Sequence, residues 1–198
     1  MDADLPLIER LQAGDESALN ELIERHRGSL LGFVYRYLHD EAVARDVVQE
    51  TFVRVFFKVK QFEPRASVKT WIYAIALNLA RDQGRKLTKR RREVSLDAPG
   101  TDERPPLEIA DGALSPGEEA GQRDRFSVLQ RAIDRLPHKL KAALVLFSLE
   151  GRSQREVAEI LGTTAKSVET RVYHAKEKLH EMLAAEDASS PSSPRAKP

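Results

Sequence analysis

The chain has 198 residues, contains no cysteine and carries a formal net charge of +1. The length allows one ordinary domain or two small ones, and the lack of cysteine excludes disulfides, thiolate catalysis and cysteine-based zinc sites. No apolar run approaches the ~18 residues of a membrane span, and the amino terminus (Met1-Asp2-Ala3-Asp4) lacks the basic region of a secretory signal. We therefore expect a cytoplasmic protein without direct membrane insertion.

Amphipathic helices are predicted over the first sixty residues. Apolar residues recur at helical spacing over residues 5–38, with breaks expected near Gly14 and Gly28. A further helix is predicted over residues 40–60. Its apolar face consists of Val43, Val47, Val48, Phe52, Val55, Phe56 and Val59. The segment Glu63-Pro64-Arg65-Ala66-Ser67 then interrupts the helix, because proline lacks a backbone donor and disfavours helix in the residue before it.

An apolar segment passes into a strongly basic one over residues 71–92. The residues expected to form a buried stripe, at i, i+4 and i+8, are Trp71, Ile75 and Leu79. Tyr73 and Asn78 lie off that stripe, and seven of the residues 81–92 are cationic. Rings and a side-chain amide can bind an unstacked base while cations neutralise its phosphates. A solvated helix end or a linker is the alternative interpretation of the basic run.

An acidic stretch rich in proline and glycine follows the basic run. Over residues 93–121, eight acidic residues stand against the single Arg104. The lack of periodicity predicts a flexible, mostly extended linker. Helical spacing resumes over residues 122–186, and the Ser/Pro/Ala-rich residues 187–198 predict a disordered tail. No segment requires a β-strand. We thus predict an all-α chain with two small helical domains, residues 1–92 and 122–186, joined by the acidic linker.

A helix-turn-helix is predicted in the second helical block. The segment Ser153-Gln154-Arg155-Glu156 has the form of a capping box, and Gly162 ends the short helix that it starts. Thr164 can cap the next helix. The buried face expected for that helix is Val168, Val172, Ala175 and Leu179. Its polar face is Lys166, Ser167, Glu169, Thr170, Tyr173 and Lys176. This polar face favours major-groove binding over a plain helical hairpin.

Two parts of the chain resemble conserved regions of bacterial RNA polymerase sigma factors. The segments similar to the second region are residues 40–52, Phe62, 70–73, 76–78 and 80–81. The segments similar to the fourth region are Leu136-Pro137 and residues 150–153, 156–162 and 167–172. A chain of this length with only these two regions resembles the extracytoplasmic-function (ECF) group. The resemblance implies a factor that binds core RNA polymerase, recognises minus-35 and minus-10 promoter elements and helps to melt DNA.

The resemblance also implies which residues meet each partner. The clamp coiled coil of the largest polymerase subunit and the flap would bind the chain, with clamp contacts at Asp46, Gln49, Glu50 and Phe52. The implied minus-10 contacts are Phe62, Glu63, Arg65, Ser67, Tyr73, Asn78, Arg81, Arg85 and Lys86, with Lys89 and Arg90 also tracking the backbone. The implied minus-35 contacts are Arg152, Ser153, Lys166, Ser167, Glu169, Thr170, Arg171, Tyr173 and Lys176. A cognate anti-sigma factor is a further implied partner.

The chain departs from the family pattern in two places. The loop at residues 63–67 lacks the glycine and aspartate of many relatives, which puts the identity of the captured base in doubt. Glu169 replaces a residue that is often basic in relatives, and a carboxylate prefers the amino group of cytosine. The minus-35 element is therefore expected to be atypical. The acidic linker suits a segment that threads the polymerase channel, although acidic linkers without such a role are common.

Two other function classes remain as alternatives. An autonomous helix-turn-helix regulator that binds duplex DNA without polymerase would explain residues 153–179, but such a protein normally needs a dimerisation element. An enzyme would need a catalytic constellation. The five histidines are scattered and no phosphate loop or nucleophile motif is present. We therefore expect neither catalysis nor a bound cofactor or metal in this chain.

Overall fold

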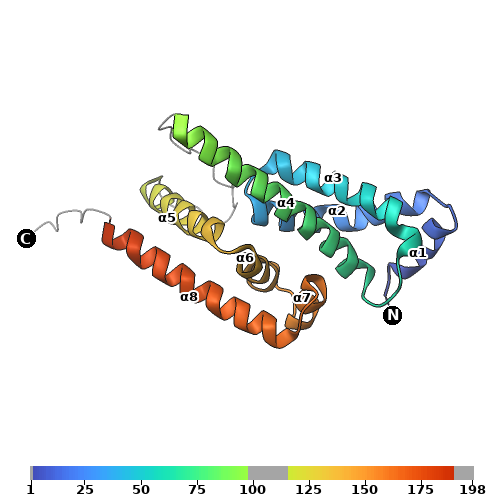
Figure 1. Ribbon diagram of the computed structural model, residues 1–198. Helices are drawn as coiled ribbons and strands as arrows, with labels where there is room; N and C mark the ends of the chain where they lie inside the picture. The colour runs from blue at the N-terminus through green and yellow to red at the C-terminus, as the bar shows by residue number, and fades with distance from the viewer. Residues whose placement is uncertain (1, 98–115, 190–198) are drawn as a thin grey trace, which may run out of the picture.

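The computed structural model describes the backbone of residues 2–97 and 116–189, which form eight α-helices and no strand (Figure 1). The helices of the first part are α1 (Leu5–Gln12), α2 (Ser17–Leu38), α3 (Glu41–Lys58) and α4 (Val68–Asp97), with a 3-10 turn, η1, at Val59–Gln61. Those of the second part are α5 (Pro116–Arg135), α6 (His138–Leu144), α7 (Gln154–Leu161) and α8 (Ala165–Ser189), with a π-helical turn, η2, at Val145–Leu149. Among these described helices, none is long and apolar enough to cross a membrane.

Helix α4 lies at the centre of the amino-terminal domain. Most of its side chains between residues 72 and 80 are buried, and α2 and α3 both pack against it. The largest buried residues around it are Leu22, Leu30, Phe33, Val34, Val47 and Val55. The chain turns sharply from α2 into α3 because His39 adopts a left-handed conformation, with φ of 53°, and the Asp40 carboxylate accepts a bond from the Val43 N–H at 3.0 Å. The predicted helix over residues 40–60 is thus confirmed.

The helix-turn-helix of the second part forms as its local sequence predicts. The Ser153 hydroxyl accepts a bond from the Glu156 N–H at 3.2 Å, and the Glu156 carboxylate accepts one from the Ser153 N–H at 2.9 Å. Gly162 ends α7 with φ of 59°, where a side chain would be strained. Thr164 caps α8 by accepting a bond from the Ser167 N–H at 3.2 Å. The predicted buried face, Val168, Val172, Ala175 and Leu179, is confirmed.

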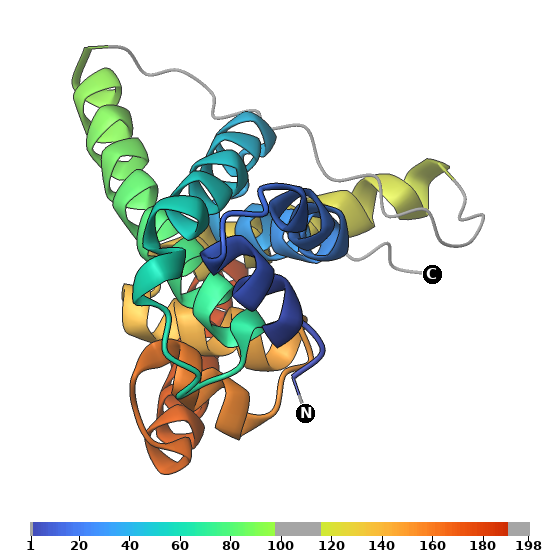
Figure 2. The ribbon, with the colours of Figure 1, turned by 90° about the vertical axis from the view of Figure 1, so that its right-hand side faces the viewer.

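The two helical domains pack directly against each other. Helix α7 contacts α4 and η2 contacts α2, and both views show the second part lying along the first (Figures 1 and 2). One hydrophobic core runs through both domains. Its members from the second part include Ala142, Ala143, Val145, Leu146, Val157, Ala158 and Ile160. The sequence predicted two domains but not the contact between them, because the apolar face of a helix does not show which other helix will cover it.

Three predicted boundaries were wrong. Helix α2 is unbroken at Gly28, because one glycine costs only about 1 kcal/mol relative to alanine in a helix interior. The predicted linker is helical at both of its ends, over residues 93–97 of α4 and 116–121 of α5, where Pro116 occupies the first helical position that suits proline. The predicted tail is helical as far as Ser189. The rest of the linker and tail lies outside the described residues.

Ser153→Ala should lower the free energy of unfolding by about 1 kcal/mol, because α7 loses its amino-terminal cap. Urea unfolding at pH 7, followed by circular dichroism, measures the change. The bond from Ser153 lowers the pKa of the Glu156 carboxyl, so its contribution is present above the ordinary glutamate pKa and is lost as pH falls through the lowered one. The control is Ser148→Ala at an exposed position of η2. Equal stability of the two variants would contradict the capping role.

Candidate nucleic-acid and protein interfaces

The loop between η1 and α4 presents its side chains to solvent. Phe62 is buried beneath it, with its ring 4.9 Å from that of Trp71. Glu63 and Arg65 are exposed and form an ion pair at 2.6 Å. Ser67 caps α4, because its hydroxyl accepts a bond from the Thr70 N–H at 3.1 Å. The four candidate contacts in this segment are thus held together at one end of α4, and three of them face solvent.

Asn78 and Tyr73, the two candidates on α4, differ sharply in exposure. Asn78 is exposed, whereas Tyr73 has no exposed surface. The Tyr73 ring packs on Phe33 with centroids 5.2 Å apart, and the Arg152 guanidinium carbon lies 3.7 Å from the same ring centroid. The expectation that Tyr73 lies outside the buried part of α4 was wrong. The physical reason is that the second domain covers a further face of the helix, so Tyr73 belongs to the shared core.

Cations gather where the basic part of α4 approaches the second domain. Arg85, Lys86 and Lys89 are exposed and Arg81 is half-buried, while the side chain of Arg90 lies outside the described residues. Burial lowers the pKa of His138, and Arg81, Arg85, Lys139 and Arg171 lower it further. These cations come from both domains, so a positive potential that can attract phosphate spans the junction between them.

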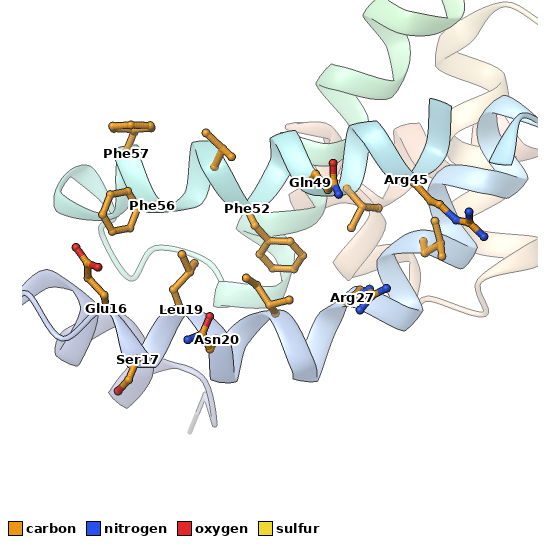
Figure 3. Close-up of a pocket in the computed structure, with 14 residues that line it drawn as sticks. Glu16, Ser17, Leu19, Asn20, Arg27, Arg45, Gln49, Phe52, Phe56 and Phe57 are labelled. Atoms are coloured by element: carbon orange, nitrogen blue, oxygen red, sulfur yellow. The ribbon is translucent and has the colours of Figure 1, made fainter. Parts of the chain in front are cut away.

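The candidate polymerase contacts lie on the outer side of α3. Asp46, Gln49 and Glu50 are exposed, and Glu50 pairs with Arg54 at 2.8 Å. Phe52 is 5% exposed and points into a groove between α3 and α2 (Figure 3). The groove also holds two residues that the sequence analysis missed, Val53 and Phe57, which are 47% and 74% exposed. Their apolar character, off the predicted buried face of an amphipathic helix, was the available signal.

Helix α8 presents the predicted polar face to solvent. Its exposed members are Lys166, Glu169, Thr170, Tyr173 and Lys176, while Ser167 and Arg171 are half-buried. Lys166 pairs with Glu169 at 3.0 Å, so this carboxylate already has a cationic neighbour. The hydroxyl of Tyr173 bonds Glu177, which raises the pKa of the tyrosine. The face therefore combines donors and acceptors at the spacing that a major-groove helix requires.

Arg152 and Ser153, the remaining minus-35 candidates, are held by the protein itself. Arg152 is 8% exposed and stacks on Tyr73, and Ser153 is exposed but engaged as the α7 cap. The structure thus brings together one minus-10 candidate and one minus-35 candidate in a single buried contact. Within the described residues, no group of three or more histidines and carboxylates could hold a metal ion.

Comparisons with known protein families agree with this division into two parts. Residues 22–92 match the model of sigma-70 region 2, and residues 126–179 match that of sigma-70 region 4. The groove and base-capture candidates fall in the first match, apart from the groove residues before residue 22. The candidate recognition face of α8 falls in the second.

Curated relatives and solved structures give the same result. The chain is 32% identical to the RNA polymerase sigma-H factor of Pseudomonas aeruginosa over 92% of this chain and 94% of that protein. It is 30% identical to the ECF RNA polymerase sigma-E factor of Haemophilus influenzae over 91% of this chain and 95% of that protein. A structure of CnrH with the cytosolic domain of CnrY matches with a TM-score of 0.64 at 26% identity, over 93% of this chain and 99% of that one. The chain therefore belongs to the ECF group of the sigma-70 family of RNA polymerase sigma factors.

Proposed function

We propose that the amino-terminal domain docks on core RNA polymerase and captures a base of the minus-10 element, while α8 reads the minus-35 element. The observation that carries the proposal is that one chain offers two different DNA-binding surfaces. The exposed face of α8 suits duplex DNA, whereas the loop at residues 63–67 with Asn78 suits an unstacked base. An autonomous regulator would need only the first surface. We assign catalysis of RNA synthesis to the polymerase and not to this chain. We also place the chain in the cytoplasm, together with the polymerase.

The α3 groove supports the assignment of the polymerase contact. Asp46, Gln49 and Glu50 supply polar groups beside the exposed apolar surface of Val53 and Phe57. A coiled-coil partner presents charged groups along an apolar seam, so its surface is complementary in both respects. The Phe56 and Phe57 rings lie 5.5 Å apart in an edge-to-face arrangement and would form the apolar end of the contact.

A protein regulator is also part of the proposal. The matched structures include CnrH with the cytosolic domain of CnrY and a Bartonella quintana sigma factor, RpoE, with its anti-sigma factor NepR; the second is 21% identical with a TM-score of 0.59 and supports the fold alone. Both proteins were captured with a partner chain. We propose that a cognate anti-sigma factor binds this chain and competes with the polymerase for its helical surfaces.

Replacing Gln49 and Glu50 together by alanine should weaken binding to core polymerase by more than tenfold. Each bond to a charged group contributes about 1.5–3 kcal/mol, and a factor of ten corresponds to about 1.4 kcal/mol. Both side chains are exposed, so the unfolding transition should hardly move. Titration of labelled core polymerase measures the affinity. Glu24→Ala, an exposed substitution on α2, serves as the control. Wild-type affinity in the double variant would remove these residues from the interface.

The two DNA contacts should respond differently to a premelted template. Asn78→Ala should lower run-off transcription from a duplex promoter and recover partly on a template with an open bubble, because the bubble supplies the unpairing energy. Stacking and capture of one base contribute about 1–3 kcal/mol. Thr170→Ala should stay impaired, because the upstream major groove remains unread. Equal rescue of both variants, or of neither, would contradict the division of labour. Tight promoter binding by the chain alone would favour the autonomous regulator.

A further inference from the structure

The loop at residues 63–67 has few contacts of its own that could hold its shape. Glu63, Pro64, Arg65 and Ser67 are exposed and Ala66 is half-buried. The Glu63–Arg65 ion pair is exposed on both sides, and pairs of this kind contribute about 0–1 kcal/mol. A loop built in this way is positioned mainly by what holds its two ends.

The first twelve residues of the chain hold both ends. At the entry, the Gln12 amide donates to the carbonyl of Val59 at 2.8 Å and to that of Phe62 at 3.4 Å. At the exit, the Asp2 carboxylate accepts a bond from the Val68 N–H at 2.6 Å, across a separation of 66 residues in sequence. A carboxylate at this place also complements the positive end of the α4 dipole.

Asp2 and Gln12 are themselves fixed to the core. The apolar face of α1, which connects them, is buried at Leu7, Ile8 and Leu11. The Asp2 side chain also accepts a bond from the Asp4 N–H at 3.1 Å, and the Asp4 carboxylate binds His26 at 2.8 Å and Arg25 at 2.7 Å. Helix α1 therefore connects the two ends of the loop to α2.

We propose that Asp2 and Gln12 are positioning residues for base capture, which hold the loop at residues 63–67 in its binding conformation before DNA arrives. The proposal rests on the proposed function of that loop. A preorganised loop loses less conformational freedom on binding, so removal of an anchor should weaken capture although neither residue touches DNA. The loss should appear as lower affinity and as weaker discrimination among bases at the captured position.

The test uses the holoenzyme with labelled single-stranded DNA hexamers that the wild type selects from a randomised pool. Gln12→Leu and Asp2→Ala should each weaken hexamer binding by roughly two- to tenfold, as expected for one or two hydrogen bonds. They should also flatten the base preference at one position. Asp2→Asn, which keeps an acceptor oxygen, should retain most of the affinity. The controls are Gln61→Leu, next to the loop, and Glu9→Ala on α1, both at exposed positions.

A role in stability alone would give a different result. In that case the variants would lose core affinity and minus-35 duplex binding in parallel, with an unchanged base preference. That outcome, or wild-type hexamer binding in both variants, would overturn the proposal. If the wild-type holoenzyme enriched no hexamer at all, that result would refute the proposed function of the loop in base capture. The positioning role of Asp2 and Gln12 would then fail as well.

A separate observation, the contact between Tyr73 and Arg152, carries a second inference. Phe33 covers one side of the Tyr73 ring and the Arg152 guanidinium lies over it at 3.7 Å. Both residues are buried, so the ring has no face left on which a base could stack. Arg36 and Glu150 also form an ion pair across the two domains, and Lys141 lies 4.9 Å from the Tyr37 ring centroid.

The contact between Tyr73 and Arg152 has unfavourable as well as favourable contributions to its free energy. Among the described residues, the Tyr73 hydroxyl and the Arg152 Nε are buried without a hydrogen-bond partner. An unpaired buried polar group costs about 1–3 kcal/mol, which offsets part of the attraction between the cation and the ring. Opening the contact would return both groups to water or to DNA, which would offset part of the cost of separating the domains.

We infer that Arg152 is an internal plug, which occupies the place of an extruded base on Tyr73 until the two domains part. The inference rests on the proposed function of the amino-terminal domain and on the role in base capture that the resemblance to sigma factors implies for Tyr73. Because Arg152 is also a candidate phosphate contact at the minus-35 element, binding there would draw the plug away from Tyr73. The two DNA sites would then be coupled through one side chain.

The test measures binding of the selected hexamers to the free chain without polymerase. Arg152→Ala should strengthen binding by about tenfold, although the chain loses a positive charge. Arg155→Ala removes the same charge from a 91% exposed position on α7 and should not strengthen it. Arg36→Ala breaks the ion pair with Glu150 away from the ring and should give a smaller gain. Unchanged or weaker binding in both Arg152→Ala and Arg36→Ala would overturn the plug, while failure of the holoenzyme to select hexamers would instead refute base capture.

Discussion

The burial of α4 on more than one side is the constraint on which the rest of the structure depends. The apolar segment of α4, over residues 71–80, is buried on more than one side, and α2 and α3 cover only part of it. Helix α7 covers a further part, and through that contact the two domains share one core. The same helix begins at the candidate base-capture loop and continues into the basic segment. The packed segment, the candidate base-capture loop and the basic residues therefore lie along one helix.

This arrangement links the two proposed promoter-reading surfaces in the free chain. The proposed recognition face of α8 is exposed while Tyr73 is covered, so under the proposed function the closed protein would meet duplex DNA before it held an extruded base on Tyr73. Interfaces between domains of one chain usually resemble transient complexes and can open. The Tyr73 hydroxyl and the Arg152 Nε are buried without a hydrogen-bond partner among the described residues, so their return to water would offset part of the cost of opening.

Local chemistry explains which parts of the fold the sequence predicted. The capping box at residues 153–156, the end of α7 at Gly162 and the buried face of α8 depend on residues within a few positions of one another. The helix over residues 40–60 follows from its apolar spacing in the same way. The resemblance to sigma factors supplied the candidate contacts, and the structure places most of them at the surface.

Long-range contacts explain what the sequence did not predict. Tyr73 is buried by Arg152 from the other domain, and no periodicity in α4 could reveal that partner. The bond from Val68 to Asp2 spans 66 residues, so no local pattern could show that Asp2 anchors one end of a loop. The exposed Phe57 was missed because the spacing of α3 assigns a buried face and says nothing about apolar residues elsewhere. Each of these depends on tertiary packing and not on propensity.

Locking the domains together tests the account most directly. The chain has no cysteine, so Arg36→Cys with Glu150→Cys introduces the only two thiols, on either side of the interdomain ion pair. A reducible bis-maleimide cross-linker can then join them. We predict that the cross-linked protein forms no open promoter complex with core polymerase and regains it when the linker is cleaved, whereas the single-cysteine variants are active throughout. Open complexes formed at equal rates by the locked and released protein would contradict the requirement that the domains part.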